Sequence, residues 1–228
     1  MNVKEKVKSI ILRNPIQNYI KNKKRKKIQN TDFTLLTPNC TGGIIYHNLG
    51  LKFLSPTINL MMLQKDFLQF VLHLDDYLEG SFHFFKHETY ACPCANLVPQ
   101  NNKKEITIHF THYHSEEESI KKWNERKGRI NKNNLFIVIE QRDGITKEDL
   151  LQLREINATG IVAFTYEDYP DIPYAVYLPK YKECGEVGNL LLQNHLTGQR
   201  EFDNYFDYVK WFNEANGYPY DVSPYRKI

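Results

Sequence analysis

The sequence of 228 residues predicts an α/β fold: a single domain with a mostly parallel sheet covered by helices on both faces, plus a basic amphipathic N-terminal helical arm. Three observations predict this fold. Continuous apolar runs at 135–139 and 160–165 are typical of strands buried on both faces. Segments with helical periodicity alternate with the predicted strands, which favours parallel pairing through helical crossovers. Finally, the basic side chains are concentrated at the N-terminus.

The arm is predicted over residues 1–32 and the α/β domain over residues 33–228. Residues 1–32 hold ten of the 30 basic side chains and two of the 27 acidic ones, so the arm carries a net charge of +8 and the domain −5. Val3, Val7 and Ile10 recur at helical spacing, which makes the arm amphipathic. Asn14 followed by Pro15 predicts the N-cap and first turn of a second helix.

Three interpretations of the arm remain open. It can be a solvated tail whose apolar face packs on the domain. It can lie on an anionic membrane surface through residues 1–30, where each basic residue contributes about 1 kcal/mol. It can bind nucleic acid, but the domain has no basic–aromatic stripe, so no nucleic-acid partner is expected. No signal peptide and no apolar run of ~20 residues are present, which predicts a cytoplasmic protein, free or peripheral on the inner face of the cell membrane.

The elements of the domain are predicted in order from local patterns. Strands are expected at 33–37, 105–110, 135–139, 160–165 and 174–178, and helices at 44–49, 63–78, 115–129, 146–156 and 202–216. The stretch 81–100 is expected to be irregular. Ser115 and Thr146 are each followed three residues later by an acidic residue, which predicts a capping box at the start of each helix.

The first candidate site is the turn between the first strand and the following helix. Ligands of open α/β sheets bind at the carboxyl ends of strands. Gly42 and Gly43 allow close approach of a ligand to the backbone, and the helix N-terminus offers N–H donors. In this position Cys40 is expected to have its thiolate favoured, with neighbouring amides as donors to an oxyanion. The alternative is a small buried cysteine in a tight turn.

The second candidate cluster follows the predicted strand 105–110. His112 and Tyr113 lie just past the strand, where a general base belongs, and Cys40 with His112 would form a thiolate–imidazolium nucleophile. His109 is expected to be an interior histidine and His114 a solvent-facing one.

Arg126 and Arg129 form the third cluster, because they share one helix face and precede Asn131. Paired guanidinium groups suit phosphate or carboxylate ligands, although a surface face balanced by the neighbouring glutamates is the alternative.

A fourth pattern supplies four soft ligands: His83, His87, Cys92 and Cys94. The Cys-x-Cys spacing differs from the usual zinc knuckle, and the flanking sequence is aromatic and irregular. No metal site and no cofactor are expected.

The ordered set of these motifs resembles one family. The motifs are Asn39-Cys40-x-Gly42-Gly43, Ser55-Pro56 with Asn59, His109 to Tyr113, and Trp123 with Arg126, Arg129 and Asn131. From residue 33 to the closing helix the chain resembles the bacterial domain of unknown function numbered nineteen-nineteen, often labelled an exopolysaccharide or capsular polysaccharide biosynthesis protein. More distantly, it is similar to the papain-like cysteine peptidase family found near polysaccharide genes. Thr41 departs from the aromatic residue frequent after the cysteine, and the arm lies outside the resemblance.

The resemblance implies a role in polysaccharide assembly with a saccharide or an activated sugar or acyl donor as the partner. We expect a transferase in which Cys40 is the nucleophile and His112 the base. The expected substrate-binding residues are Asn39, Gly42, Gly43, Ser55, Asn59, Tyr113, Arg126, Arg129 and Asn131, with the glycine amides as an anion cradle and the arginines on donor phosphates. The alternatives are a non-catalytic scaffold that holds a saccharide or lipid carrier at the membrane, and a cysteine hydrolase.

Overall fold

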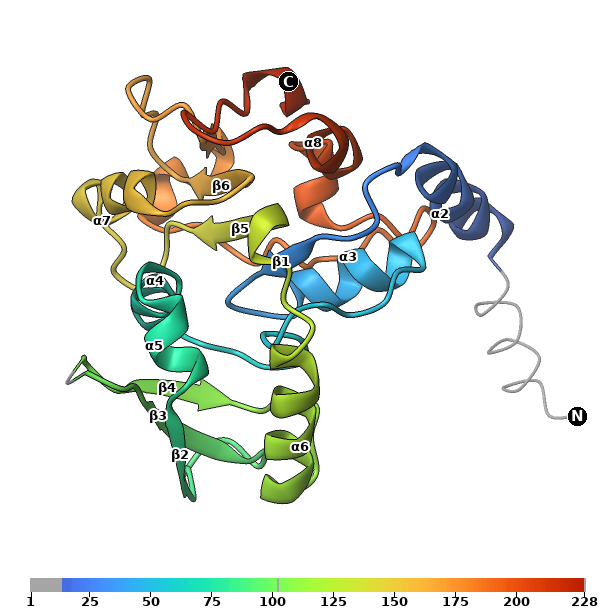
Figure 1. Cartoon of the computed structure of the whole chain (residues 1–228). Coiled ribbons are helices and arrows are strands. Elements are labelled where there is room, and N and C mark those ends of the chain that lie inside the picture. Colours follow the sequence, from blue (N-terminus) through green and yellow to red (C-terminus); the bar gives the residue numbers. More distant parts are fainter. Residues whose placement is uncertain (1–13, 102, 228) are drawn as a thin grey trace, which may run out of the picture.

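The computed structural model describes residues 14–101 and 103–227 and contains two sheets (Figure 1). Expectations for residues 1–13, including the first amphipathic stretch of the arm, lie outside the described residues. The larger sheet is parallel with strand order β1-β5-β6-β7. Its strands are β1 (Thr34–Leu36), β5 (Leu135–Glu140), β6 (Gly160–Thr165) and β7 (Ala175–Tyr177). The α/β fold is therefore confirmed.

A second sheet is inserted in the chain between β1 and β5. It is antiparallel and consists of β2 (Ser81–Phe85), β3 (Cys94–Val98) and β4 (Ile106–His109). The expected irregular stretch 81–100 is therefore wrong, and the predicted strand 105–110 belongs to this sheet. The alternating pattern along β2 consists of aromatic side chains. Phe82 packs edge-on against Phe110 and Trp123, with ring centroids 5.6 and 5.2 Å apart.

Helices cover both sheets (Figure 1). α3 (Thr41–Leu49) follows β1, while α4 (Gln64–Leu72) and α5 (Leu74–Leu78) lie between the sheets, where α4 contacts both β4 and β5. α6 (Glu116–Lys127) flanks the antiparallel sheet, and α7 (Lys147–Gln152) and α8 (Tyr208–Glu214) lie beside the parallel one. Short 3-10 turns are η1 (Lys132–Asn134), η2 (Leu153–Glu155), η3 (Pro179–Cys184), η4 (Glu201–Asn204) and η5 (Ser223–Tyr225). Phe212 of α8 stacks on Phe33 with centroids 4.1 Å apart, which closes the core over β1.

Three predicted helices are shorter than expected. The helix 146–156 ends as α7 at Gln152, where the 3-10 turn η2 follows. The helix 63–78 breaks at His73, whose φ of −128° lies outside the helical region, and this break separates α4 from α5. The helix 202–216 contains α8 only from Tyr208, because the Asp207 carboxylate accepts a hydrogen bond from the amide of Lys210 and caps the helix there.

The predicted helix starts are partly confirmed. Both hydrogen bonds of the capping box join Thr146 and Asp149, at 3.2 and 2.9 Å. At α6 the Ser115 hydroxyl accepts from the amide of Glu118 at 3.1 Å, but the Glu118 carboxylate accepts from the amide of His114 instead of closing the box.

The described part of the arm is α2 (Pro15–Lys27), which begins at the predicted cap Asn14. It docks on the domain through polar contacts. Lys24 Nζ lies 2.5 Å from a carboxylate oxygen of Asp203, and Arg25 Nε donates to the carbonyl of Asn48 at 3.0 Å. Across residues 14–101 and 103–227, no helix has the length and apolar character needed to cross a membrane.

Candidate functional site

Cys40 lies at the carboxyl end of β1, directly before α3. The preceding Asn39 fixes this turn in two directions. Its side-chain oxygen accepts from the amide of Thr41 at 3.0 Å, and its Nδ2 donates to Glu140 Oε1 at 2.8 Å. The first turn of α3 is thereby tied to the end of the neighbouring strand β5. Both polar groups of Asn39 are used within the chain, so this residue positions Cys40.

His112 lies just past the end of β4 and is held there by its neighbours in sequence. His109 and Met61 exchange two backbone hydrogen bonds of 2.8 and 2.9 Å. The hydroxyl of Tyr113 donates to the carbonyl of Ile58 at 2.9 Å. These contacts fix the loop that carries His112 to the segment that precedes α4.

The two loops bring Cys40 and His112 together. The distance from Cys40 Sγ to His112 Nε2 is 3.3 Å, although the residues are 72 positions apart in the chain. Cys40 is half-buried and His112 is exposed. A second pair, Cys94 Sγ and His109 Nδ1, is also 3.3 Å apart, but both of its residues are buried. Of these two pairs, the one with Cys40 combines contact with access to solvent.

Burial raises the pKa of the Cys40 thiol, and a hydrogen bond with Thr111 lowers it only in part. The amides that could stabilise a thiolate are largely occupied, because Thr41 donates to Asn39 and Gly42 donates to Thr37 Oγ1 at 3.1 Å. Burial therefore disfavours the thiolate that the sequence led us to expect at Cys40. In a pair of a neutral thiol and an imidazole, the imidazole must take the proton as the thiol attacks.

A cavity of about 490 Å³ opens beside this pair. Its volume is within the range of pockets for small ligands. It is lined by Lys21, Cys40, Gly43, Ile44, His47, Asn48, Phe53, Asn59, His112, Gln193, Gly198 and Arg200. Sequence reasoning missed the walls contributed by α2 and by the segment 193–200, since no local pattern shows that these distant segments adjoin α3.

Gly42 and Gly43 differ in what they offer this cavity. A Cβ at Gly42 would lie 2.9 Å from Thr37 Oγ1, and its amide is already bonded to that oxygen, so Gly42 serves packing. Gly43 lines the cavity, and its amide has no acceptor among the described residues. Asn59, which adopts a φ of 64°, lies beside Gly43 in the same wall. The predicted two-amide cradle is therefore reduced to Gly43, with the Asn59 side chain as its neighbour.

The structure does not bring the other predicted substrate-binding residues to this cavity. The hydroxyl of Ser55 is buried and bonded to Thr57. Arg129 pairs loosely with Glu125 at 3.8 Å, and Asn131 caps η1. Tyr113 and Arg126 are also buried, and neither lines the cavity.

Arg126 has a structural role. Its Nη1 donates to the carbonyl of Ile58 at 2.9 Å and also to the hydroxyl of Tyr113, and its guanidinium lies 5.6 Å from the ring centre of Phe53. It is 7% exposed. This cluster holds the loops of Asn59 and His112, which explains why an arginine at this position contributes to the site without lining it.

The Arg126→Ala variant is expected to lose about 2–3 kcal/mol of unfolding free energy, because hydrogen bonds to a buried charged group contribute about that much. Arg129→Ala is the matched control on the same helix, and it should change stability by less than about 0.5 kcal/mol because its ion pair is partly exposed. Urea unfolding of both variants checks this. Equal, small effects would contradict the structural role of Arg126.

Glu140 is a residue of the site that sequence reasoning missed. It ends the apolar run of β5, and that placement of a charge was the available signal. Its side chain is buried, and burial raises the pKa of its carboxyl from 4.5 to about 7, against opposing effects of the Asn39 hydrogen bond and Arg142. Arg142 Nη1 lies 3.9 Å from Glu140 Oε2. Glu140 thus accepts the hydrogen bond that holds Asn39, and with a pKa of about 7 its carboxyl changes charge near neutral pH.

Replacing Glu140 with glutamine should change the pH dependence of stability. A carboxyl with a raised pKa binds its proton more tightly in the folded state, so its stabilisation is complete below pH 4.5 and is lost as pH rises through about 7. The unfolding free energy of the natural protein relative to Glu140→Gln should therefore fall by about 3 kcal/mol over that interval. Urea unfolding at several pH values measures it, with the exposed Glu183→Gln as the control. Parallel curves for the natural protein and Glu140→Gln would refute the assignment.

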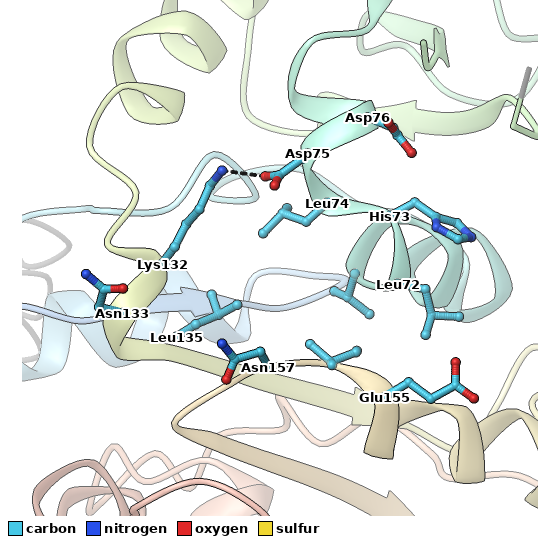
Figure 2. Close-up of a pocket in the computed structure, with 12 residues that line it drawn as sticks. Leu72, His73, Leu74, Asp75, Asp76, Lys132, Asn133, Leu135, Glu155 and Asn157 are labelled. Carbon is cyan, nitrogen blue, oxygen red and sulfur yellow. Dashed lines mark hydrogen bonds and ion pairs between the residues drawn. The ribbon is translucent and has the colours of Figure 1, made fainter. Parts of the chain in front are cut away.

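A second cavity, of about 450 Å³, lies at the amino end of β5 (Figure 2). Figure 2 shows Lys132 reaching across its mouth to an ion pair with Asp75. It carries carboxylates from Asp76 and Glu155 and contains no cysteine. Ligands of open parallel sheets bind at the carboxyl ends of the strands, so the cavity beside Cys40 is the stronger candidate.

The four soft ligands considered from sequence form no metal site in the described part of the chain, which contains no group of three or more His, Cys, Asp or Glu side chains placed to hold a metal ion. His87 Nδ1 instead accepts from the amide of Thr89 at 3.0 Å.

The sheet and the Cys40 cavity define an α/β protein with a candidate thiol–imidazole site at the carboxyl edge of its parallel strands. The chain belongs to the family described as domain of unknown function (DUF1919), which matches residues 11–213. It is 34% identical over 216 residues to an uncharacterized protein of Haemophilus influenzae, across 94% of this chain and 100% of the relative. The family match includes α2, which corrects the expectation that the whole arm lies outside the resemblance.

Proposed function

We propose that this protein is a transferase that moves an acyl group onto a saccharide through a thioester on Cys40. The observation that carries the proposal is the 3.3 Å contact of Cys40 Sγ with His112 Nε2 at the edge of an open cavity. A thiol beside a base is the arrangement that nucleophilic catalysis requires. The polysaccharide context comes from the family resemblance, and the amide side chains of Asn48, Asn59 and Gln193 in the cavity wall suit hydroxyl groups of a sugar.

The reaction follows from the groups present. The Cys40 sulfur attacks the carbonyl carbon of the donor while His112 takes the thiol proton. The oxyanion accepts from the amide of Gly43, and its collapse expels the leaving group, which takes the proton from His112. A saccharide hydroxyl then attacks the thioester and gives its proton to His112. The acylated saccharide leaves, and the proton returns to Cys40.

Acetylation by p-nitrophenyl acetate tests the nucleophile without knowledge of the natural donor. Peptide mapping after a short incubation is expected to find the acetyl group on Cys40 before it appears on Cys184, an exposed cysteine elsewhere in the chain. Buried Cys94, which also contacts a histidine, serves as the internal reference for a paired but inaccessible thiol. Faster labelling of Cys184 than of Cys40 would overturn the proposal.

A non-catalytic saccharide-binding scaffold is the second candidate, and the raised pKa of the Cys40 thiol favours it. The same experiment separates the two functions, because a scaffold forms no acetyl-Cys40 and binds its saccharide equally well after Cys40→Ser. A cysteine hydrolase would form the thioester and release acetate to water even when hydroxyl acceptors are abundant.

We also propose that the outer face of α2 lies on an anionic membrane surface. Ile16 and Tyr19 are 43% and 68% exposed, and Leu196, whose backbone contacts the start of α2, is 60% exposed. Asn14 Nδ2 donates to the carbonyl of Leu196, which places Leu196 next to α2. Exposed Lys23, Lys26 and Lys27 on the same helix add positive charge.

Co-sedimentation with phosphatidylserine vesicles tests the membrane proposal. The double variant Ile16→Ser, Tyr19→Ser should bind at least about tenfold more weakly, because both apolar anchors are lost. Equal binding by this variant and the natural protein would refute it, as would equal binding to vesicles of zwitterionic phosphatidylcholine, which carry no net charge.

A further inference from the structure

The cavity beside Cys40 carries positive charge that its walls do not balance. Lys21 and Arg200 line it together with His47 and His112, and none of the lining residues that the structure describes is an aspartate or glutamate. Lys21 and Arg200 come from opposite ends of the sequence, α2 and the segment before η4. The docking of α2 on the domain therefore creates a cationic wall that neither segment has alone.

The position of Lys21 follows from two of the contacts that dock α2. Lys21, Lys24 and Arg25 share one helix face, since they are spaced three and four residues apart. Lys24 pairs with Asp203, and Arg25 donates to the carbonyl of Asn48 at the end of α3. Lys21 has no ion pair among the described residues. Two of the three cations hold the helix, and the third is left to face the cavity.

Arg200 is the more unusual of the two cations. Its Nη1 donates to the carbonyl of Leu191 at 2.7 Å. Its Nε is buried, and it is the buried side-chain polar atom that lacks a partner in the part of the chain that the structure describes. The nearby carboxylate of Asp203 accepts from the backbone amide of Arg200 at 2.8 Å and pairs with Lys24, so it does not neutralise the guanidinium. A buried donor without an acceptor is unfavourable, so the hydrogen bonding of the Arg200 side chain is incomplete within the described part of the chain.

We propose that Lys21 and Arg200 form a phosphate-binding subsite, and that the substrate of the Cys40 site is a phosphorylated compound; the second part rests on the proposed function. The charge of the wall selects this class of ligand. A phosphate monoester carries a charge of about −1.5 to −2 at pH 7, which matches one lysine and one arginine, whereas a carboxylate neutralises one of them. Arginine, with its forked guanidinium, and lysine, with its compact ammonium, are both usual hydrogen-bond donors to a phosphate group.

This subsite differs from the one expected on Arg126 and Arg129. Arg126 is buried in contact with Ile58 and Tyr113, and Arg129 lies beside Glu125, so neither faces the cavity of Cys40. The phosphate-binding role passes to two residues that local sequence patterns did not single out.

A matched pair of probes tests the subsite. Phenyl phosphate and benzoate share an aromatic ring and differ in the anionic group, and their affinities for the full chain are measured by calorimetric titration at fixed ionic strength. Phenyl phosphate is expected to bind at least about tenfold more tightly than benzoate. Lys21→Gln and Arg200→Gln should each weaken phenyl phosphate binding about tenfold or more, the loss of one charge-assisted contact. Lys26→Gln, an exposed lysine of α2 outside the cavity, should leave it unchanged.

The outcomes separate this subsite from the proposed function. Cys40→Ser should bind phenyl phosphate as the natural protein does, so a failure of Cys40 chemistry with intact binding overturns only the transferase. Equal affinities for Lys21→Gln and Lys26→Gln overturn the subsite, and so does equal binding of phenyl phosphate and benzoate. If Arg200→Gln unfolds, the Lys21 comparison alone decides, because Lys21 is on a surface helix without buried residues.

Discussion

The Cys40→Ser variant is expected to release p-nitrophenol from p-nitrophenyl acetate without an initial burst, with acylation reduced at least about 10³-fold. Serine has nearly the shape of cysteine, so the half-buried position and the cavity are preserved. The serine hydroxyl is a far weaker nucleophile than the thiol. It is also a much weaker acid, and burial at this position disfavours its anion further. Stopped-flow absorbance measures the burst.

The control for this variant is Cys184→Ser, which removes an exposed thiol outside the site. It should reduce only the slow, non-saturating labelling of the chain and leave the burst intact. A burst that survives Cys40→Ser, or one that disappears with Cys184→Ser, would show that the reactive thiol is elsewhere.

The His112→Ala variant should slow acylation of Cys40 by about 10²- to 10⁴-fold, which is the usual contribution of a general base. We expect a large effect because burial raises the pKa of the Cys40 thiol and so disfavours the thiolate, and because His112 Nε2 lies 3.3 Å from the sulfur. In a preformed thiolate the loss would be smaller. The rate of acetyl-Cys40 formation, followed by peptide mapping, measures the effect.

His114→Ala is the matched control, since His114 is an exposed histidine two positions along the same loop. Its acylation rate should equal that of the natural protein. Equal rates for His112→Ala and His114→Ala would contradict the pairing, and unchanged urea unfolding of both variants excludes a folding defect as the cause.

The sequence predicts the parallel sheet well because each pattern that indicates it lies within a short stretch of the chain. The apolar runs of β5 and β6 and the capping box of Thr146 with Asp149 each depend on residues close together in the chain. The same logic found Cys40 and His112, since each follows a strand. It could not show that their loops meet, because that contact depends on the bridge between Met61 and β4, which joins segments far apart in sequence.

The failures have the same physical origin. We expected Arg126 to bind a substrate, but helical spacing does not say which face of a helix packs inward. The side chain of Arg126 points inward and donates to the buried carbonyl of Ile58. Lys21 and Arg200 meet at one cavity because α2 docks on the domain, for example through Lys24 on Asp203, 179 residues away. Glu140 had a local signal, a charge at the end of an apolar strand, and its partner Asn39 is 101 residues distant.

The central claim is that His112 removes the proton of Cys40 as the thiol attacks, and the solvent isotope effect on Cys40 acetylation tests it most directly. Rates in H₂O and D₂O are compared over matched ranges of pH and pD, with Cys184 of the same molecules as the internal reference. We predict slower acetylation of Cys40 in D₂O and loss of that difference in His112→Ala. Equal Cys40 rates in the two solvents, with His112→Ala as fast as the natural protein, would contradict the claim.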